Sequence, residues 1–448
     1  MNKSIELKIT DINYEGMGIA TYNNKTVFVE RALKDEVVLA EIDFENKNFY
    51  RAHTTKVIQA SKDRIIPPCT TYEKCGGCQL LHAAYQKTLE YKLKTTNNTL
   101  KRIGKVDFEI KEILGMDEVF PYRNKVQIPV TSVDNKLVCG YFERRTHNII
   151  PFKTCLLQSK QVDEIIIFIK NIFNEFKISG YNENSHEGIL RHIMIRENKY
   201  NQIMIVLVIN DNKLKCEEEI KNKIINKYPN VVSIIINSNT NKNNVILGDK
   251  SYPLYGKDEI IDELLGFKYK ISHYSFFQIN RCQAEVLYNK VLEYVGNAEN
   301  VVDAYCGVGT ISLSLSKIAK YVYGIEVVAP AIDNANENKK LNNVENVEFI
   351  LGKVEDKIFD LLERVNIDCV VIDPPRKGLD VKVIEALKQS KIKRIVYVSC
   401  NPSSFARDID LLKEDYEIKK ATLVDMFAYT TGVECVALLE RKYEINNI

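Results

Sequence analysis

The stretch Val396-Tyr397-Val398-Ser399-Cys400-Asn401-Pro402 places a cysteine where an apolar run ends, directly before a turn-forming Asn-Pro pair. The run from Ile392 to Val398 is rich in β-branched and aromatic residues, which indicates a buried strand of an α/β sheet. In open α/β sheets, ligands bind just outside the carboxyl ends of the strands. The stretch therefore predicts an α/β sheet with the thiol of Cys400 at its functional edge.

Two further strands end in polar or glycine-rich loops, and helical segments separate all of them. Residues 369–372 lead into Asp373-Pro374-Pro375-Arg376-Lys377-Gly378, and residues 300–302 lead into the loop 303–310. Alternation of this kind predicts a mostly parallel, doubly wound sheet. The expected helices span 281–295, 311–319, 330–341, 356–363 and 380–389, and the expected strands span 300–303, 321–326, 346–350, 368–372 and 393–398.

The segments before this region have other patterns. Residues 5 to about 60 form short alternating stretches separated by turn residues, which favours a small β-barrel of the oligonucleotide-binding type. Residues 82–103 are compatible with a helix, and from about 119 to 270 the pattern is mixed, with strands at 126–130 and 204–208 and a helix near 161–177. We therefore expect a β-barrel at 1–60, a mixed α+β domain at 61–270 and the α/β domain at 271–448.

Composition limits the class of protein. The chain has 448 residues, 45% of them hydrophobic and 27% charged, and a net charge of +2, so any nucleic acid would be held by local basic patches. No apolar run approaches the roughly 18 residues that span a bilayer, and residues 1–6 lack the apolar core of a signal peptide. A cytoplasmic protein with reduced thiols is expected. Five of its eleven cysteines are expected to be small buried hydrophobes, namely Cys139, Cys216, Cys282, Cys369 and Cys435.

The loop after the strand at 300–303 indicates a nucleotide-type cofactor. Gly307 and Gly309 permit a tight turn, and Glu326 ends the next strand, where a carboxylate accepts hydrogen bonds from ribose hydroxyls. The absence of a third glycine disfavours NAD or FAD, and the absence of a Gly-Lys-Ser/Thr sequence disfavours ATP hydrolysis. S-adenosylmethionine remains as the common ligand. In the alternative, structural interpretation the glycines only turn the chain, which leaves Glu326 unexplained.

Cys400 is either an inert buried thiol or a nucleophile. With S-adenosylmethionine on the neighbouring loop, a thiolate has a specific use: adding to carbon 6 of uracil makes carbon 5 nucleophilic enough to attack a sulfonium methyl. A base must then remove the carbon-5 proton, and Glu434, at the start of an apolar strand, is the candidate. Asp373-Pro374-Pro375 resembles the loop of amino-group methyltransferases, but Arg376 replaces their aromatic residue, which argues against nitrogen methylation.

Taken in order, Gln278-Ile279-Asn280, the loop 303–309, the loop 373–378, Ser399-Cys400-Asn401-Pro402 and Val433-Glu434 resemble the RNA uracil-5-methyltransferase family. The resemblance covers essentially the whole chain and is closer to the ribosomal RNA branch, which carries a TRAM barrel and an iron–sulfur cluster. It implies a class I (Rossmann-like) S-adenosylmethionine methyltransferase domain, and a monomer acting on 23S ribosomal RNA, with transfer RNA as the alternative. The implied site residues are Gln278, Tyr305, Glu326 and Asp373 for the cofactor, Cys400 as nucleophile, Glu434 as proton acceptor, and Phe276 or Phe277 stacked on the flipped base.

A second cluster, Cys69-x5-Cys75-Gly76-Gly77-Cys78, supplies three closely spaced thiols, and Cys155 follows later. The spacing suits zinc and a four-iron cluster equally. The resemblance favours [4Fe-4S] bound by Cys69, Cys75, Cys78 and Cys155, with a structural or RNA-folding role. The nearby segments 122–125 and 141–145 suit phosphate and stacking contacts, or form a solvated charged face.

Two rival functions are open to test. A non-catalytic RNA-binding protein with a redox-sensing cluster would make Cys400, Glu326 and Glu434 incidental. A cytosine-5-methyltransferase would be expected to carry its thiol in a different proline–cysteine context.

Overall fold

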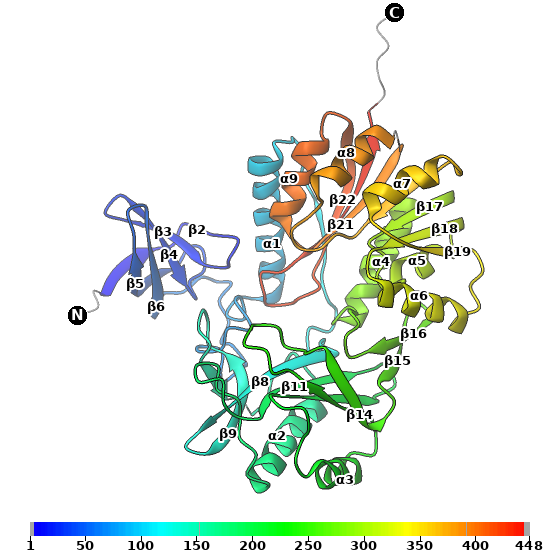
Figure 1. Ribbon diagram of the computed structural model, residues 1–448. Helices are drawn as coiled ribbons and strands as arrows, with labels where there is room; N and C mark the ends of the chain where they lie inside the picture. The colour runs from blue at the N-terminus through cyan, green and yellow to red at the C-terminus, as the bar shows by residue number, and fades with distance from the viewer. Residues whose placement is uncertain (1–3, 152, 391, 443–448) are drawn as a thin grey trace, which may run out of the picture.

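The computed structural model describes residues 4–151, 153–390 and 392–442; the first residues of segment 1–6 lie outside them. The C-terminal sheet has the order β19-β18-β17-β20-β21-β23-β22-β7 (Figure 1). Strands β17 to β21 pair in parallel, and β23 lies antiparallel between β21 and β22. The strands are β17 (Ala298–Ala304), β18 (Ala319–Glu326), β19 (Val347–Leu351), β20 (Cys369–Ile372), β21 (Arg394–Ser399), β22 (Tyr416–Val424), β23 (Glu434–Arg441) and β7 (Glu112–Leu114).

The helices between these strands lie on both faces of the sheet, as the alternating pattern predicted. They are α4 (Arg281–Val295), α5 (Thr310–Leu315), α6 (Ala329–Leu341), α7 (Val354–Leu362), α8 (Val381–Ser390) and α9 (Pro402–Leu412). Helix α5 ends at Leu315, earlier than the expected 319, because the Asn346 side chain donates hydrogen bonds to the carbonyls of Ser316 and Ala319 and fixes a turn there. Neighbouring residues on one strand enter opposite cores, as with Val370 and Val371 of β20.

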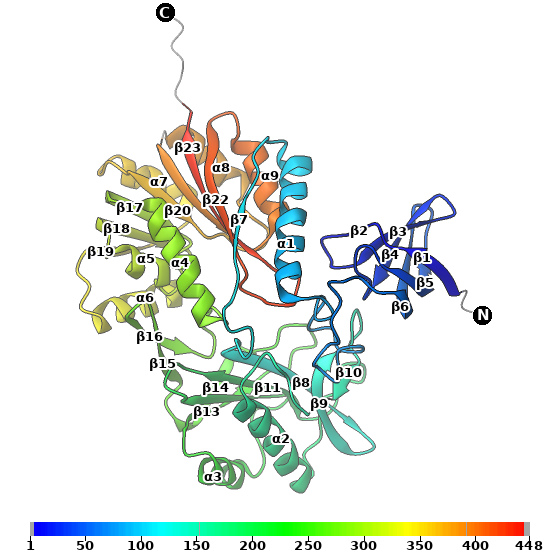
Figure 2. The ribbon, with the colours of Figure 1, turned by 180° about the vertical axis from the view of Figure 1, so that it is seen from behind.

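A segment from the middle of the chain completes this sheet. Helix α1 (Tyr85–Thr99) continues into the π-helical turn η1 (Leu100–Gly104), which packs against α9. Strand β7 then pairs in parallel with β22, and Figure 2 shows α1 and β7 running along this edge. Residues 85–114, which the sequence pattern placed with the 61–270 region, therefore lie with the C-terminal sheet.

The N-terminal sheet has the order β1-β5-β6-β4-β3-β2. Its residues alternate between solvent and a small core that contains Leu7, Val27 and Val38, as expected for strands with one covered face. The strands are β1 (Ser4–Lys8), β2 (Asp11–Ile12), β3 (Gly18–Tyr22), β4 (Lys25–Glu30), β5 (Val37–Glu45) and β6 (Phe49–Gln59).

The central sheet has the order β10-β9-β8-β11-β12-β13-β14. Every residue of β12 is buried because α2 and α3 cover one face, whereas α4 and the hairpin β15–β16 pack against the other. The elements are β8 (Lys125–Val133), β9 (Lys136–Phe142), β10 (Ile149–Pro151), α2 (Lys160–Glu175), β11 (Leu190–Glu197), β12 (Ile203–Ile209), α3 (Glu217–Lys227), β13 (Val231–Ser238), β14 (Lys250–Gly256), β15 (Glu259–Leu264) and β16 (Phe267–Ser272).

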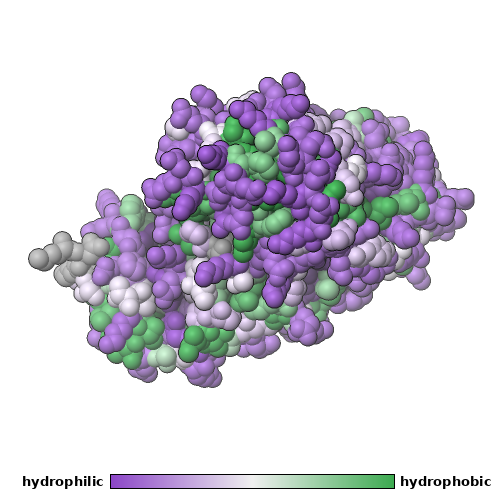
Figure 3. Space-filling view, turned by 90° about the horizontal axis from the view of Figure 1, so that it is seen from below, coloured by the Kyte–Doolittle hydropathy of each residue, from purple (hydrophilic) through white to green (hydrophobic). Residues whose placement is uncertain are grey.

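The face shown in Figure 3 is mainly hydrophilic, with hydrophobic side chains in scattered patches. Within the described residues, no helix is both long and apolar enough to cross a membrane. Cys139, Cys369 and Cys435 are buried as expected, but the prediction was wrong for Cys216 and Cys282, which are exposed. Cys216 caps α3 in a left-handed conformation, and Cys282 lies in the first turn of α4.

Candidate active site and cysteine pocket

A cleft of about 1290 Å³ opens at the carboxyl ends of the C-terminal strands. This volume exceeds that of most small-molecule pockets, so it has room for a cofactor and part of a larger substrate. Residues predicted from sequence meet there although they lie far apart in the chain. They are Phe276, Gln278, Tyr305, Asp373, Cys400 and Glu434.

Cys400 lies in the turn between β21 and α9. The side chain of Asn401 accepts a hydrogen bond from the Ser403 backbone N–H at 3.0 Å and so caps α9, while Pro402 occupies its first turn. The Asn401 Nδ2 also donates to the Arg376 carbonyl at 3.0 Å. One side chain thus fixes the Cys400 turn against the loop that follows β20.

Glu434 reaches the same place from the opposite strand direction. Because β23 is antiparallel to β21, with Cys435 opposite Ser399, its first residue lies beside the end of β21 that leads to Cys400. Glu434 is only 4% exposed. Burial and the nearby Asp373 raise its pKa well above the usual value, and Arg376 opposes this.

The electrostatics of Cys400 follow from the same neighbours. Burial, Glu434 and Asp373 raise the pKa of the Cys400 thiol, and Arg376 acts in the opposite direction. A thiol whose pKa is raised in this way is protonated at neutral pH, and only the thiolate form of a cysteine is nucleophilic.

Asp373 begins the loop between β20 and α8, and burial raises its pKa to about 7. The loop turns at Gly378, which has φ +78° and donates its N–H to the Pro375 carbonyl at 2.8 Å. The buried Asp408 then accepts the Leu379 N–H at 2.8 Å and the Tyr397 hydroxyl at 2.6 Å. These contacts fix the position of Asp373 relative to Cys400.

The loop 303–310 contains two glycines with different surroundings: Gly309 is closely packed, and Gly307 faces open space. A Cβ at Gly309, which has φ +86°, would lie 2.7 Å from the Phe349 ring, whereas a Cβ at Gly307 would meet nothing within 4 Å. The Gly307 N–H donates to Glu326 Oε2 at 3.2 Å. Glu326 is not among the residues that line the cleft, but it borders the loop through this bond.

Asp303 lies beneath this loop and is fully buried. Its Oδ2 accepts a hydrogen bond from the Ser312 hydroxyl, while its Oδ1 has no partner among the described residues. Burial raises the pKa of Asp303 to about 7. A donor supplied by a ligand would satisfy this oxygen.

The remaining candidates differ in how they are held. Tyr305 has φ +68°, a strained conformation that recurs at functional sites. Asn124 of the central domain donates its side-chain N–H to the Gln278 carbonyl at 2.9 Å. Phe276 is 73% exposed at the cleft, whereas Phe277 is 3% exposed and packs in the core, so only Phe276 is placed to stack on a base.

The loop 425–433, which leads to Glu434, is braced by two other regions of the chain. Lys92 of α1 donates to Asp425 Oδ1 at 2.5 Å and to the Phe427 carbonyl at 3.0 Å. The backbone N–H groups of Gln79 and Leu80 donate to the Tyr429 carbonyl at 3.0 and 2.9 Å. The base candidate is therefore tied to α1 and to the cysteine-bearing segment.

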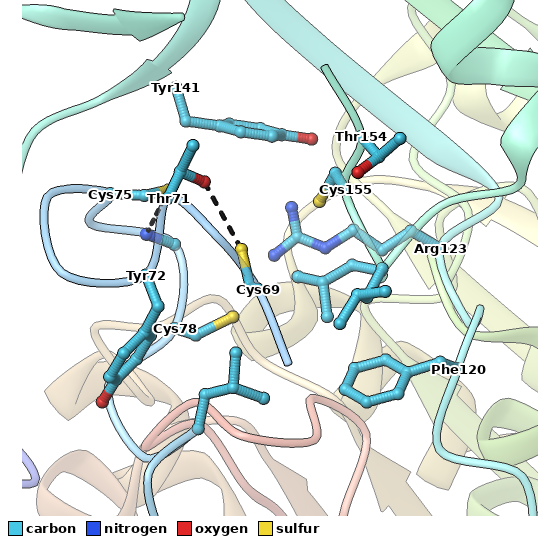
Figure 4. A pocket seen from close by; sticks show the side chains of 14 residues that line it. Cys69, Thr71, Tyr72, Cys75, Cys78, Phe120, Arg123, Tyr141, Thr154 and Cys155 are labelled. Carbon is cyan, nitrogen blue, oxygen red and sulfur yellow. Dashed lines mark hydrogen bonds between the residues drawn. The ribbon is translucent and has the colours of Figure 1, made fainter. Parts of the chain in front are cut away.

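Cys69, Cys75, Cys78 and Cys155 line one pocket, shown in Figure 4. Cys69 contacts the Thr71 hydroxyl at 3.4 Å, and the Gly77 N–H donates to the Cys75 sulfur at 3.4 Å. The other lining residues are mostly apolar, and none of the fourteen is Asp or Glu. Four thiols in a pocket whose described lining contains no acid suit zinc or an iron–sulfur cluster.

The four thiols line the pocket without forming a metal-binding arrangement in the structure. Among residues 4–151, 153–390 and 392–442, no three His, Cys, Asp or Glu side chains form a ready metal site. Burial raises the pKa of Cys78 to about 12 and also raises the pKa values of Cys75 and Cys155.

Residues 84–442 match the model of the tRNA (uracil-5-)-methyltransferase family, and residues 2–55 match the TRAM domain. The chain belongs to the tRNA (uracil-5-)-methyltransferase family. It is 45% identical over 443 residues to an uncharacterized RNA methyltransferase of Clostridium tetani, covering 98% of this chain and 96% of that protein. A similar protein of Clostridium acetobutylicum is 44% identical over 448 residues, with 98% and 97% covered.

A solved structure supports the same assignment. The tRNA (uracil-54, C5)-methyltransferase of Pyrococcus abyssi, in complex with S-adenosyl-L-homocysteine, is 31% identical and superposes with a TM-score of 0.79, covering 97% of this chain and 99% of that one. The family and the expected fold class are therefore confirmed. The protein is an S-adenosylmethionine-dependent RNA methyltransferase of the uracil-5 type.

The TRAM domain contacts the central domain through basic residues of segment 141–145, for which the sequence left open phosphate and stacking contacts or a solvated charged face. Arg144 forms an ion pair with Glu30 at 3.4 Å, and Arg145 pairs with Glu15 at 3.2 Å and with Glu30 at 2.9 Å. Both arginines also line the cleft. The ion pairs of these two arginines therefore link the TRAM domain to the central domain.

Sequence reasoning missed the residues that hold this site in place. Asn401 was taken only as a turn former, although Asn before Pro at a helix start is also a capping signal. Arg376, noted as a departure from another family, proves to be the charge that opposes the pKa shifts of Cys400 and Glu434. Lys92 and Asp425 gave no sequence signal as a pair because 333 residues separate them.

Proposed function

We propose that the enzyme methylates carbon 5 of uridine through a covalent bond to Cys400. The Cys400 thiolate adds to carbon 6 of uracil, and the electron pair moves to carbon 5. Carbon 5 then forms a bond to the sulfonium methyl group of bound S-adenosylmethionine as the methyl–sulfur bond breaks, which would leave S-adenosylhomocysteine. Glu434 removes the carbon-5 proton, the double bond returns, and the sulfur leaves carbon 6.

The observation that carries this proposal is the convergence of Cys400 and Glu434 on one cleft from two adjacent antiparallel strands. If Cys400 were an inert thiol and Glu434 a structural acid, nothing would require the two side chains to meet in one cleft. A carboxylate whose pKa is raised by burial is also a stronger base, once ionised, than an exposed one.

The proposal is tested by separating addition from elimination. Cys400→Ala should abolish methyl transfer but leave binding of S-adenosylmethionine intact, because the thiol attacks the base and not the cofactor. Glu434→Gln should still add and methylate, and should accumulate an enzyme–RNA adduct that carries the labelled methyl group and survives denaturing electrophoresis. Glu440→Gln, the same change at the far end of β23, is the matched control.

Two results would contradict the covalent route. They are turnover by Cys400→Ala within about tenfold of wild type, and an adduct that persists when both residues are changed. Full turnover by Glu434→Gln without adduct would reassign the base and leave the nucleophile in place.

We further propose that Gln278, Tyr305, Glu326 and Asp373 hold S-adenosylmethionine. The open space at Gly307 and the unpartnered Oδ1 of Asp303 support a ligand on this loop. Glu326→Ala should weaken cofactor binding by about 1.5–3 kcal/mol, measured by calorimetric titration, because charge-assisted hydrogen bonds to ribose are lost. Unchanged affinity would remove Glu326 from the site.

For the RNA substrate we propose 23S ribosomal RNA, held in part by the TRAM domain over residues 1–60. The four-cysteine pocket and the resemblance to the ribosomal RNA branch support this choice. The Pyrococcus relative acts on uracil 54 of transfer RNA, which makes transfer RNA the specific alternative. Mapping 5-methyluridine in both RNAs from a deletion strain would distinguish the two substrates, because the RNA that lacks the modification is the one that the enzyme methylates.

For the cysteine pocket we propose a [4Fe-4S] cluster bound by Cys69, Cys75, Cys78 and Cys155, with zinc as the alternative. The four thiols and the apolar walls of the pocket fit such a group. Anaerobically purified protein should be brown with about four irons per chain, and Cys75→Ser should bleach it. Cys216→Ser, which changes an exposed thiol elsewhere, should not. A colourless protein with stoichiometric zinc would favour zinc.

A further inference from the structure

Arg123 places a cation in the wall of the cysteine pocket. Its backbone N–H donates to the Leu157 carbonyl at 2.8 Å, which fixes it beside the segment that carries Cys155. Figure 4 shows its guanidinium projecting between Cys69 and Cys155. The same side chain also lines the active-site cleft, so it lies between the two sites.

This arginine has no carboxylate partner in the pocket. Its Nε is buried and has no hydrogen-bond partner among the described residues, and the Tyr122 side chain that interacts with the guanidinium is uncharged at neutral pH. Among the described residues, no Asp or Glu lines the pocket. A guanidinium remains charged at any pH a protein tolerates, and a charge out of water is costly unless it is paired.

Four cysteine thiolates would supply the missing negative charge. Their combined charge exceeds that of Zn²⁺ or of an oxidised four-iron core, so either complex is net negative. Four neutral thiols would leave Arg123 without a negative charge beside it in the pocket. An anionic metal–thiolate group would supply the counter-charge that the walls of the pocket do not.

We propose that Arg123 is the counter-charge of the four-cysteine site and sets the reduction potential of the group bound there. This inference rests on the proposed [4Fe-4S] cluster. Reduction adds one electron to a group that is already negative, so a nearby cation favours the reduced form. Removing the cation should lower the potential.

The test is a potentiometric titration of the anaerobically purified full-length protein, with dithionite as reductant and electron paramagnetic resonance as readout. Arg123→Met keeps the length of the side chain and removes its charge. It should lower the potential by about 59 mV or more, which corresponds to a tenfold or larger change in a one-electron equilibrium. Iron should also be lost to a chelator about tenfold faster.

Two variants separate charge from packing. Arg123→Lys keeps the cation and should titrate near wild type. Arg145→Met removes another arginine of the cleft, which does not line the cysteine pocket and is already paired with Glu15 and Glu30, so it should leave the potential unchanged. If Arg123→Met does not fold, Arg123→Gln against Arg123→Lys gives the same comparison.

The outcomes are distinct. A wild-type protein without iron overturns the proposed cluster. An iron-containing wild type whose potential and iron retention are unchanged in Arg123→Met overturns only the role of Arg123. A variant that binds RNA less tightly at an unchanged potential would show that Arg123 serves the cleft instead, which also overturns the proposal.

Discussion

Lys92→Met should destabilise the protein because it leaves a carboxylate buried without its cation. Lys92 is 2% exposed and Asp425 is 0% exposed, and their charged atoms lie 2.5 Å apart. After the change, the Tyr85 hydroxyl, at 2.7 Å, is the one side-chain hydrogen-bond partner left to Asp425 among the described residues. Breaking a buried pair from one side typically costs about 3–5 kcal/mol, a large share of the roughly 5–15 kcal/mol that stabilises a domain.

The assay is urea unfolding followed by tyrosine fluorescence and circular dichroism, with the slope compared between variants. Lys87→Met is the matched control: it lies on the same helix, but its ion pairs with Asp63 and Glu90 involve side chains that are 23% and 56% exposed. The control should lose no more than about 1 kcal/mol. Lys92→Met should also reduce turnover more than cofactor affinity, because Lys92 donates to the Phe427 carbonyl in the loop before Glu434.

A double variant checks the reasoning. Lys92→Met with Asp425→Asn removes both charges of this pair, and the asparagine still accepts the Tyr85 hydroxyl. It should recover about half or more of the lost stability, since an ion pair replaced by neutral groups is often nearly neutral in effect. A loss below about 1 kcal/mol in Lys92→Met, or no recovery in the double variant, would refute the assignment of a buried, uncompensated carboxylate.

Three other predictions follow from the active cleft. Alkylation of Cys400 by iodoacetamide, followed by mass spectrometry of its peptide, should be slow at pH 7 and should become faster as the pH rises. Glu434→Gln should accelerate alkylation by lowering the pKa of Cys400. An unaltered rate would show that Glu434 does not influence the Cys400 thiol. Asn401→Ala should cost about 1 kcal/mol of stability through the lost cap and should reduce turnover more than cofactor binding, measured by unfolding and steady-state kinetics; equal losses in both would contradict a positioning role. Asp303 has a pKa of about 7 in the folded protein, against about 3.9 when unfolded. Its protonated form therefore stabilises the fold below pH 4, and this contribution to stability is lost as the pH rises through 7. Unfolding experiments should show Asp303→Asn to be more stable than wild type at pH 8, by at most about 4 kcal/mol, and not at pH 4.

The sequence predicted the C-terminal sheet well because the hydrophobic pattern of its strands and helices agreed with the turn-forming residues that separate them. Strands such as Cys369–Ile372 are short, apolar and followed directly by polar turns, and helix α9 begins with a side-chain cap from Asn401. The site residues at strand ends followed from the same logic. Parallel strands bring their carboxyl ends to one edge, so Asp373 and Cys400 could be placed together without knowing any tertiary contact.

Long-range assembly could not be read in the same way. Strand β7 has only three residues and joins β22 across more than three hundred positions, and no local pattern encodes such a pairing. Phe276 and Phe277 are chemically identical neighbours, and only the packing of the core decides which one faces the cleft. The exposure of Cys216 and Cys282 was missed for the same reason, because a thiol carries no sign of its surroundings.

The loop 425–433 explains why the cysteine pocket belongs to this enzyme's architecture. The Tyr429 ring stacks on Phe120, a residue that lines the pocket, with centroids 5.3 Å apart. Its carbonyl accepts the N–H groups of Gln79 and Leu80, which directly follow Cys78. Five residues later the chain reaches Glu434. If the pocket holds the proposed metal group, ordering of the cysteine segment would therefore stiffen the loop that positions the proposed base.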